Sequence, residues 1–199
     1  MTDKFEMSMM GELKFFLGFE IKKLREETFI CQAKYIQDMI KKFKLLGLNG
    51  VTTPMQTKCH LELNPNGKEV DQKEYRSMIG SLLYLCVSRP DIVLSVGVYA
   101  RNQAAPKESL LIAVKRIFRY LVHTPCFGLW YPKDGTMSLC VYTDSDWAGD
   151  IDDRKSTSGT CQFLGRYLVS WSSKKQNCIS LSTTEAEDVA AARGCTQLL

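Results

Sequence analysis

The sequence has few of the features that mark zinc-stapled, membrane-spanning or exported proteins. Its 199 residues include only two histidines, His60 and His123, and no Cys-x-x-Cys pair, so the ligand spacing of a structural zinc site is absent. No uncharged stretch approaches the ~20 apolar residues that a membrane-spanning helix needs. The first residues lack the basic, apolar and small-residue segments of a secretory signal. These absences predict an intracellular protein, in the cytoplasm or nucleus, with no membrane span and no structural zinc.

Cysteine is present, but in a pattern that does not favour disulfides. The eight cysteines are scattered along the chain, and 45% of the residues are hydrophobic, which is enough to supply a buried core. An even number of cysteines is compatible with disulfides, but this scatter favours reduced thiols that serve in packing. The formal net charge of +4 is too small to indicate a nucleic-acid partner by itself.

The first 70 residues predict a hairpin, a helix and a linker. Residues 13–32 contain two apolar runs separated by the charged segment 22–27, which is typical of a β-hairpin. Apolar residues then follow at helical spacing and predict an amphipathic helix that ends near Gly47. The members of this apolar face are Tyr35, Ile36, Met39, Ile40 and Phe43. Residues 48–70 include Pro54 and Pro65 and show no sustained period, so they predict an extended linker.

Three helices are predicted in residues 71–123. Asp71 and Glu74 form a capping pair before the first helix, and Pro90 suits the first turn of the second, largely apolar helix. Pro106 is expected to open the third helix. The apolar positions of the first are Tyr75, Met78, Ile79, Leu82, Leu83 and Cys86, and those of the third are Leu110, Val114, Ile117, Phe118 and Leu121.

After Pro125 the pattern changes to short runs separated by turns. Residues 128–131, 138–143, 159–164 and 167–172 predict strands of one antiparallel sheet, with a hairpin turn at Gly165 and Arg166 and a further strand at 178–181. A final alanine-rich helix follows. Either Ser182 with Glu185 or Thr184 with Glu187 offers its capping pair.

Carboxylates at the end of a strand and on the last helix are the candidates for chemistry. Asp144 ends a run suited to a central strand, and only one of Glu185 and Glu187 can face the same point, because residues two apart lie on different sides of a helix. Such a pair begins a site for Mg²⁺, which prefers oxygen ligands. Alternatively, the acidic residues between 144 and 153 form a solvated turn, and the glutamates favour the positive end of the helix dipole.

Several ordered motifs resemble one family. YTDSDWAGD at 142–150, DRKSTSG at 153–159, SWSSKKQ at 170–176 and STTEAE at 182–187 resemble the ribonuclease H domain of Ty1/copia-type retrotransposons. Upstream, YRSMIGSLLYL at 75–85, RPDI at 89–92 and KRIFRYL at 115–121 resemble the connecting region of the same Pol polyprotein. LGFEI at 17–21 and QAKYI at 32–36 resemble the end of the polymerase palm and the start of the thumb.

The resemblance implies an α+β chain with four parts. Residues 1–50 would be the palm end and thumb remnant of the reverse transcriptase, 51–70 a linker, 71–125 a helical connecting region and 126–199 a truncated ribonuclease H-like domain with a mixed sheet. The family's nuclease uses Mg²⁺ held by four acidic residues to cleave RNA in RNA·DNA hybrids. By motif position Asp144 would be the first and Glu187, in preference to Glu185, the second, with Asp146 as a nearby substitute ligand.

Departures from the family pattern predict an inactive fragment. The paired aspartates of the polymerase and the later carboxylates of the nuclease are not found in the sequence, and Asp188 stands where the family commonly has an aromatic residue. The leading hypothesis is a piece of reverse transcriptase and ribonuclease H that works, if at all, with the rest of the Pol polyprotein. The alternative is a non-catalytic remnant that binds nucleic acid, or a pseudogene product.

Basic and aromatic residues offer candidate contacts to an RNA·DNA hybrid or another nucleic acid. Phosphates need only positioned cations. The candidates are Lys115, Arg116, Arg119, Lys174 and Lys175, for which solvated surface is an equal alternative. Tyr142, Trp147 and Trp171 could stack on bases, but large rings next to β-branched residues favour the core.

Overall fold

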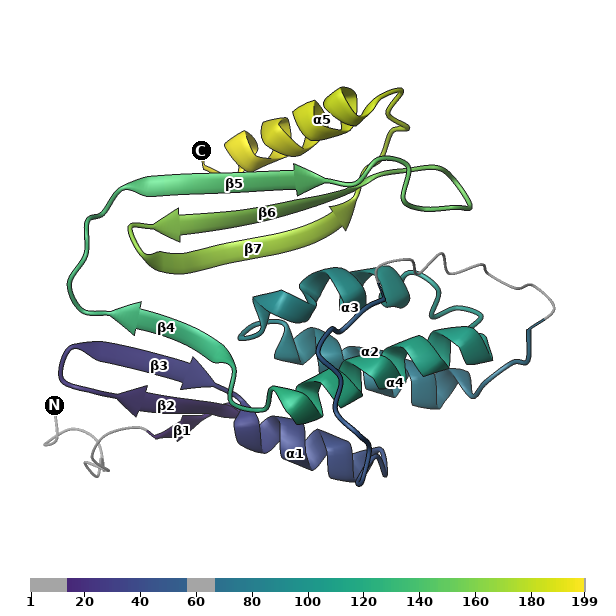
Figure 1. The fold of residues 1–199 in the computed structure, drawn as a ribbon, viewed down its shortest axis with the longest axis horizontal. Helices are drawn as coiled ribbons and strands as arrows, with labels where there is room; N and C mark the ends of the chain where they lie inside the picture. Colours follow the sequence, from purple (N-terminus) through teal and green to yellow (C-terminus); the bar gives the residue numbers. More distant parts are fainter. Residues whose placement is uncertain (1–13, 57–66, 199) are drawn as a thin grey trace, which may run out of the picture.

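The computed structural model describes residues 14–56 and 67–198 and is of mixed α/β type. Within these ranges five α-helices accompany two antiparallel sheets, which lie on different sides of a helical body (Figure 1). Residues 1–13, whose sequence lacks the segments of a secretory signal, lie outside the described ranges, as do Cys59, His60 and Pro65. No helix in the described ranges is long and apolar enough to cross a membrane.

The first sheet joins the beginning of the chain to its middle. Its strands are β1 (Phe15–Phe16), β2 (Phe19–Lys23), β3 (Glu27–Cys31) and β4 (Gly128–Pro132), in the order β1-β2-β3-β4. The pairing of β2 with β3 confirms the predicted hairpin. β4 pairs with β3 from Cys31 opposite Gly128 to Glu27 opposite Pro132. The prediction that β4 shares a sheet with the later strands is therefore wrong.

The helical body contains the main apolar core. Its elements are α1 (Ala33–Lys42), α2 (Gln72–Leu85), the 3-10 turn η1 (Pro90–Ile92), α3 (Val93–Ala100) and α4 (Glu108–His123). The side chain of Asp71 accepts a hydrogen bond from the Lys73 amide and so confirms a cap for α2. Pro90 lies in the first turn as predicted, whereas Pro106 precedes α4 by two residues. The predicted apolar face of α4 is buried throughout.

A fully buried arginine connects the elements of this body. Arg89 has no exposed surface, and its guanidinium binds both carboxylate oxygens of Asp91, with nitrogen-to-oxygen distances of 2.9 and 2.7 Å. It also donates to the carbonyl and hydroxyl oxygens of Thr124, just beyond α4, at 2.8 and 2.7 Å. The hydroxyl of Tyr120 donates to Asp91 at 2.8 Å. The RPDI motif therefore fastens η1 to the end of α4.

Part of the predicted linker is packed on α4. Arg119 donates from Nε to the carbonyl oxygen of Asn49 at 2.9 Å, and Arg116 donates from Nη2 to the hydroxyl of Thr53 at 2.9 Å. The structure shows no helix or strand in residues 46–56. The segment 49–53 is thus irregular, as the sequence predicts, but held against a helix.

The second sheet is formed by consecutive strands and covered by the last helix. β5 (Leu139–Ser145), β6 (Thr157–Leu164) and β7 (Tyr167–Lys175) pair antiparallel in chain order, and α5 (Thr183–Thr196) packs on β5 and β6 (Figure 1). Gly165, with φ +60°, forms the predicted hairpin turn. The predicted strand at 178–181 is wrong, because these residues form no ladder. The parallel pairing of a mixed sheet does not occur among the described residues.

The two sheets and the helical body touch through aromatic side chains. Trp171 of β7 donates from its indole nitrogen to the carbonyl oxygen of Cys86, beyond α2, at 2.9 Å. Tyr131 of β4 stacks on Tyr167 of β7 with ring centroids 6.2 Å apart.

The seven described cysteines are free thiols, which confirms the preference for reduced cysteine. Their expected role in packing is confirmed for Cys31, which is buried, but Cys126, Cys140, Cys178 and Cys195 are exposed.

A carboxylate site at the end of strand β5

Glu187 reaches the end of β5 because α5 is capped and packed there. The hydroxyl of Ser182 accepts a hydrogen bond from the Glu185 amide at 3.2 Å, which confirms the first of the two proposed capping pairs. The side chain of Glu185 turns back to the Leu181 amide at 2.6 Å. The carboxylate of Glu187 accepts from the Ser145 amide at 3.2 Å. Of the two glutamates, Glu187 is therefore the one that faces β5.

Asp144 occupies the same strand end but projects from the other face. Side chains alternate along a strand, and Val141 and Thr143 lie against Gly194 of α5. Asp144 consequently points away from α5, where it lines a groove of about 380 Å³ between the η1 and α3 segment and the sheet. Asp144 and Glu187 thus lie on the two sides of the end of β5, and Glu187 contacts the backbone at Ser145, the residue after Asp144.

Asp146 lies just beyond β5 and is bound by the backbone. Its carboxylate accepts a hydrogen bond from the Thr157 amide at the start of β6, and it also lines the groove. Burial raises the pKa of Asp146 above its ordinary value, although the Thr157 amide and the charge of Arg101 act in the opposite direction. Asp146 as a residue is exposed, and its hydrogen bond with the Thr157 amide joins the end of β5 to the start of β6.

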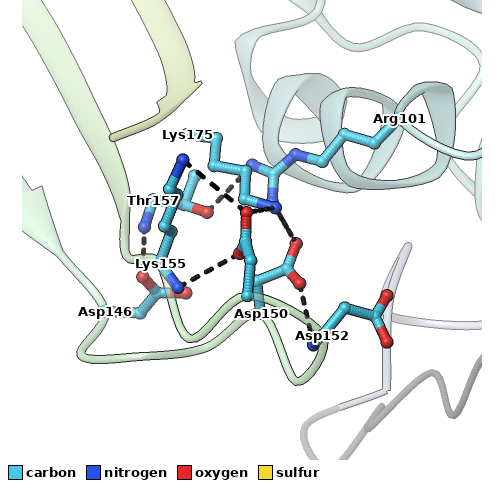
Figure 2. A network of polar contacts seen from close by, with 8 residues as sticks. Arg101, Asp146, Asp150, Asp152, Lys155, Thr157 and Lys175 are labelled. Carbon is cyan, nitrogen blue, oxygen red and sulfur yellow. Dashed lines mark hydrogen bonds and ion pairs between the residues drawn. The ribbon is translucent and has the colours of Figure 1, made fainter. Parts of the chain in front are cut away.

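An ion-pair network holds the acidic loop that follows β5. The Oδ2 atom of Asp150 forms an ion pair with Nζ of Lys175, in β7, at 2.6 Å (Figure 2). The same oxygen lies 3.6 Å from Nη1 of Arg101, just beyond α3. Lys175 also pairs with Asp153 at 2.8 Å, and Arg101 donates to the Thr157 hydroxyl at 2.9 Å. The interpretation of the acidic residues as a solvated turn is therefore wrong for Asp150 and Asp153, which are bound by cations. Asp144, Asp146 and Asp152 are exposed, as that interpretation expects.

The network shifts the pKa values of its two central members in opposite directions. Burial alone would raise the pKa of Asp150, but the hydrogen bond and charge of Lys175 outweigh it and lower that pKa. Burial alone would lower the pKa of Lys175, but the hydrogen bonds from Lys175 to Asp150 and Asp153 raise it. Asp150 thus stabilises the fold above an ordinary carboxyl pKa of about 4, and Lys175 does so below an ordinary ammonium pKa of about 10.

A double-mutant cycle on Lys175 and Asp150 is expected to give a coupling free energy of about 1–2 kcal/mol, since both side chains are less than one-third exposed and share a charged hydrogen bond. The variants are Lys175→Met, Asp150→Asn and the double variant, measured by urea unfolding. The coupling should be constant between pH 5 and 9, roughly one unit inside both ordinary pKa values, and should fall outside that window. Lys174→Met, at the exposed neighbouring lysine, is the control and should change stability by less than about 0.5 kcal/mol. A coupling no larger than the effect of this control would contradict the network.

The five basic residues that are candidate nucleic-acid contacts differ in exposure and in how many partners they already have within the chain. Arg116 and Arg119 each give one donor to the segment 49–53, and Lys175 is bound by two aspartates. Lys174 is exposed and Lys115 is half-buried. The five residues therefore do not form one equivalent set of cations.

The aromatic residues near the site are more exposed than expected. Tyr142 is 62% exposed and Trp147 is 52% exposed, so the prediction that these two rings belong to the core is wrong. The indole nitrogen of Trp147 donates to the carbonyl oxygen of Ser180 at 3.1 Å, which leaves the ring at the surface. Trp171, in contrast, packs between the sheet and the helical body.

The fit of these residues to Mg²⁺ is partial. Asp144, Asp146 and Glu187 supply the carboxylate oxygens that Mg²⁺ prefers. However, no group of three or more His, Cys, Asp or Glu side chains in the described ranges is close enough to hold a metal ion. Glu187 is bound to a backbone amide and Asp144 lies on the other side of β5. The donor chemistry therefore fits Mg²⁺, but the described side chains do not form a closed metal centre.

Sequence reasoning missed two residues that hold this region together. Gln176 is a buried amide that follows β7, and Arg101 reaches the acidic loop from the helical body. Neither belongs to a periodic pattern. The only available signal for Gln176 was its place at the end of the SWSSKKQ motif.

Comparison with known proteins gives first the class and then the family. Residues 1–57 match the family model described as "Reverse transcriptase (RNA-dependent DNA polymerase)". The whole chain is 37% identical to the retrovirus-related Pol polyprotein from transposon RE2 of Arabidopsis thaliana, and 94% of it is 41% identical to that from transposon RE1 of the same plant. The whole chain is also 33% identical to 82% of an uncharacterized mitochondrial protein of Arabidopsis thaliana. The chain belongs to the family of copia-type retrotransposon Pol polyproteins.

The extent of these matches is limited to one part of the polyproteins. The chain spans 13% of the length of the RE1 polyprotein and 14% of the RE2 polyprotein. No solved structure gives a significant match to the chain.

Proposed function

We propose that this chain combines the end of a retrotransposon reverse transcriptase with the first part of its ribonuclease H domain. The parent activities would be RNA-templated DNA synthesis and metal-dependent cleavage of RNA in RNA·DNA hybrids. The observation that carries the nuclease part is the contact between the Glu187 carboxylate and the backbone of Ser145, which follows Asp144. The order of three antiparallel strands and a covering helix supports it, because this order brings a strand carboxylate and a helix carboxylate to one strand end.

We propose in addition that Asp144 and Glu187, with Asp146 as an auxiliary ligand, would hold Mg²⁺ in the parent enzyme. The bound ion would supply a Lewis acid and an activated water for phosphodiester hydrolysis. The protein's own contribution is to fix the two carboxylates on a strand and a helix instead of on loops. Among the described residues these carboxylates do not gather into a group that could hold a metal ion, so we expect the chain alone to be inactive.

A cleavage assay tests the expected inactivity. The chain, incubated with a labelled RNA·DNA hybrid and Mg²⁺, should leave the RNA intact, because two carboxylates give a cation little charge compensation.

Mn²⁺ titration followed by NMR provides a second measurement, in which the amide signals of Asp144, Ser145 and Glu187 should broaden at millimolar Mn²⁺. The broadening should be lost in Asp144→Asn and retained in Asp38→Asn, a control on the exposed side of α1. Hybrid cleavage that Asp144→Asn abolishes would overturn the inactivity.

Binding of nucleic acid without cleavage is the second candidate function. It is favoured by the exposed rings of Tyr142 and Trp147 near Asp144, since single-stranded bases stack on such surfaces. Exposed Lys174 would contact phosphates, together with Lys115 and the remaining donors of Arg116, Arg119 and Lys175. Salt-dependent binding of a single-stranded RNA that weakens in Trp147→Ala, with no cleavage of the hybrid, would support this function, whereas salt-independent binding would exclude it.

A further inference from the structure

Gln176 is a buried side chain amide at the junction of the second sheet and α5. It follows β7 directly and is 5% exposed. Its side-chain nitrogen lies 3.1 Å from the hydroxyl oxygen of Ser145 and 3.0 Å from that of Ser158. The same nitrogen lies 2.9 Å from the carbonyl oxygen of Ala186. One amide group therefore contacts β5, β6 and α5.

The other polar atoms of Gln176 are also bound. Its backbone amide donates to the carbonyl oxygen of Ser156 at 2.8 Å, and its side-chain oxygen accepts from the hydroxyl of Ser180 at 3.0 Å. A buried network of this kind orders its members when every polar group has a partner. Gln176 consequently also fixes the irregular segment that leads from β7 to α5.

The contacts of Gln176 fall next to both candidate carboxylates. Ser145 is the residue after Asp144, and Ala186 is the residue before Glu187. We infer that Gln176 is a positioning residue, which holds the end of β5 and the first turn of α5 at the spacing that brings Glu187 to the Ser145 amide. This inference deepens the proposed function and rests on it, insofar as Asp144 and Glu187 act together.

The chemistry of the amide explains why glutamine suits this position. The side-chain nitrogen carries two hydrogens, so it can donate to two of the three oxygens around it at a time, while the side-chain oxygen accepts from Ser180. Glutamate has nearly the same shape but cannot donate to Ser158 or Ala186. Methionine fills a similar volume with no strong donor or acceptor, and burial prevents water from replacing the lost bonds.

NMR of the Ser145 amide tests the inference, because this proton lies in the hydrogen bond to Glu187. The variants are Gln176→Met, Gln176→Glu and, as the reference for complete loss of that bond, Glu187→Ala, which has no side-chain acceptor. Ile117→Val in α4 is the control for general destabilisation, as Ile117 is fully buried in the helical body. Both variants of Gln176 should move the Ser145 signal in the same direction as Glu187→Ala and speed its hydrogen exchange by at least about tenfold.

Two outcomes overturn the positioning role: an unmoved Ser145 signal in Gln176→Met, or an equal movement in Ile117→Val. If Gln176→Met does not fold, Ser158→Ala removes only one partner and should shift the signal by a smaller amount in the same direction. An unmoved signal in Ser158→Ala would then overturn the inference. Neither measurement uses nucleic acid or metal, so failure of the proposed nuclease function in the hybrid and Mn²⁺ experiments remains distinguishable from failure here.

Discussion

Replacing Asp91 by alanine is expected to lower the free energy of unfolding by about 3–5 kcal/mol, because it leaves the buried Arg89 guanidinium without its counter-ion. Arg89 has no exposed surface, whereas 30% of the Asp91 side chain is exposed, so water can reach the place of the lost carboxylate but cannot neutralise the buried guanidinium. Urea unfolding followed by circular dichroism measures the loss. Asp38→Ala, at an exposed carboxylate on α1, is the control. Similar values for the two variants would show that the Arg89 pair does not stabilise the fold.

The same pair should make the protein sensitive to acid. Burial alone would raise the pKa of Asp91, but the hydrogen bond and charge of Arg89 outweigh it and lower that pKa below its ordinary value. The stabilisation is therefore complete above an ordinary carboxyl pKa of about 4 and is lost as the pH falls below it. The difference in stability between the natural chain and Asp91→Asn should shrink between pH 4 and 2, over roughly the two units below that ordinary value. A difference that is constant in this range would contradict the lowered pKa.

Replacing Gly128 by valine is expected to separate β4 from β3 and to cost at least about 3 kcal/mol. A side chain at Gly128 would overlap the backbone carbonyl oxygen of Ile30 and approach the Cβ of Cys31 to 2.9 Å. A backbone atom in a paired strand cannot move aside as a flexible side chain does. Thermal unfolding and hydrogen exchange of the β3 amides measure the effect.

Gly80 provides a control for the replacement of glycine as such. It lies within α2, where an added Cβ would meet no atom within 4 Å. Gly80→Ala should therefore raise stability by about 0.5–1 kcal/mol, through helix propensity. Equal losses in the two variants would indicate that glycine content, and not the close approach at Gly128, determines the result.

Local periodicity predicted the helices and the hairpin well because their determinants lie within a few residues. The apolar face of α4 and the cap at Asp71 are contained within single segments. The pairing of β4 with β3 is not contained within a single segment, because Gly128 pairs with Cys31. Nothing in the intervening sequence specifies that pairing. At 178–181 an apolar run predicted a strand, but Ile179 and Leu181 are exposed and the segment pairs with no strand among the described residues.

The candidate site was predictable where it depends on order along the chain. A strand that ends at Asp144 and a capped helix that carries Glu187 follow from the sequence, and the structure brings Glu187 to the backbone beside Asp144. The placement of Asp144 on the opposite face of β5 depends on which face α5 covers, and this is a tertiary choice. The binding of Lys175 by Asp150 and Asp153 likewise depends on how the acidic loop folds back on β7.

The position of β4 limits where related retrotransposon copies can recombine without breaking a sheet. The boundary predicted at 125/126 lies before β4, which belongs to the sheet formed by residues 15–31. Recombination between related copies at that boundary would bring in a foreign β4 that must match the resident Phe29 and Ile30. A breakpoint in residues 133–138, between β4 and β5, would exchange the second sheet whole and leave every strand ladder with its native partner.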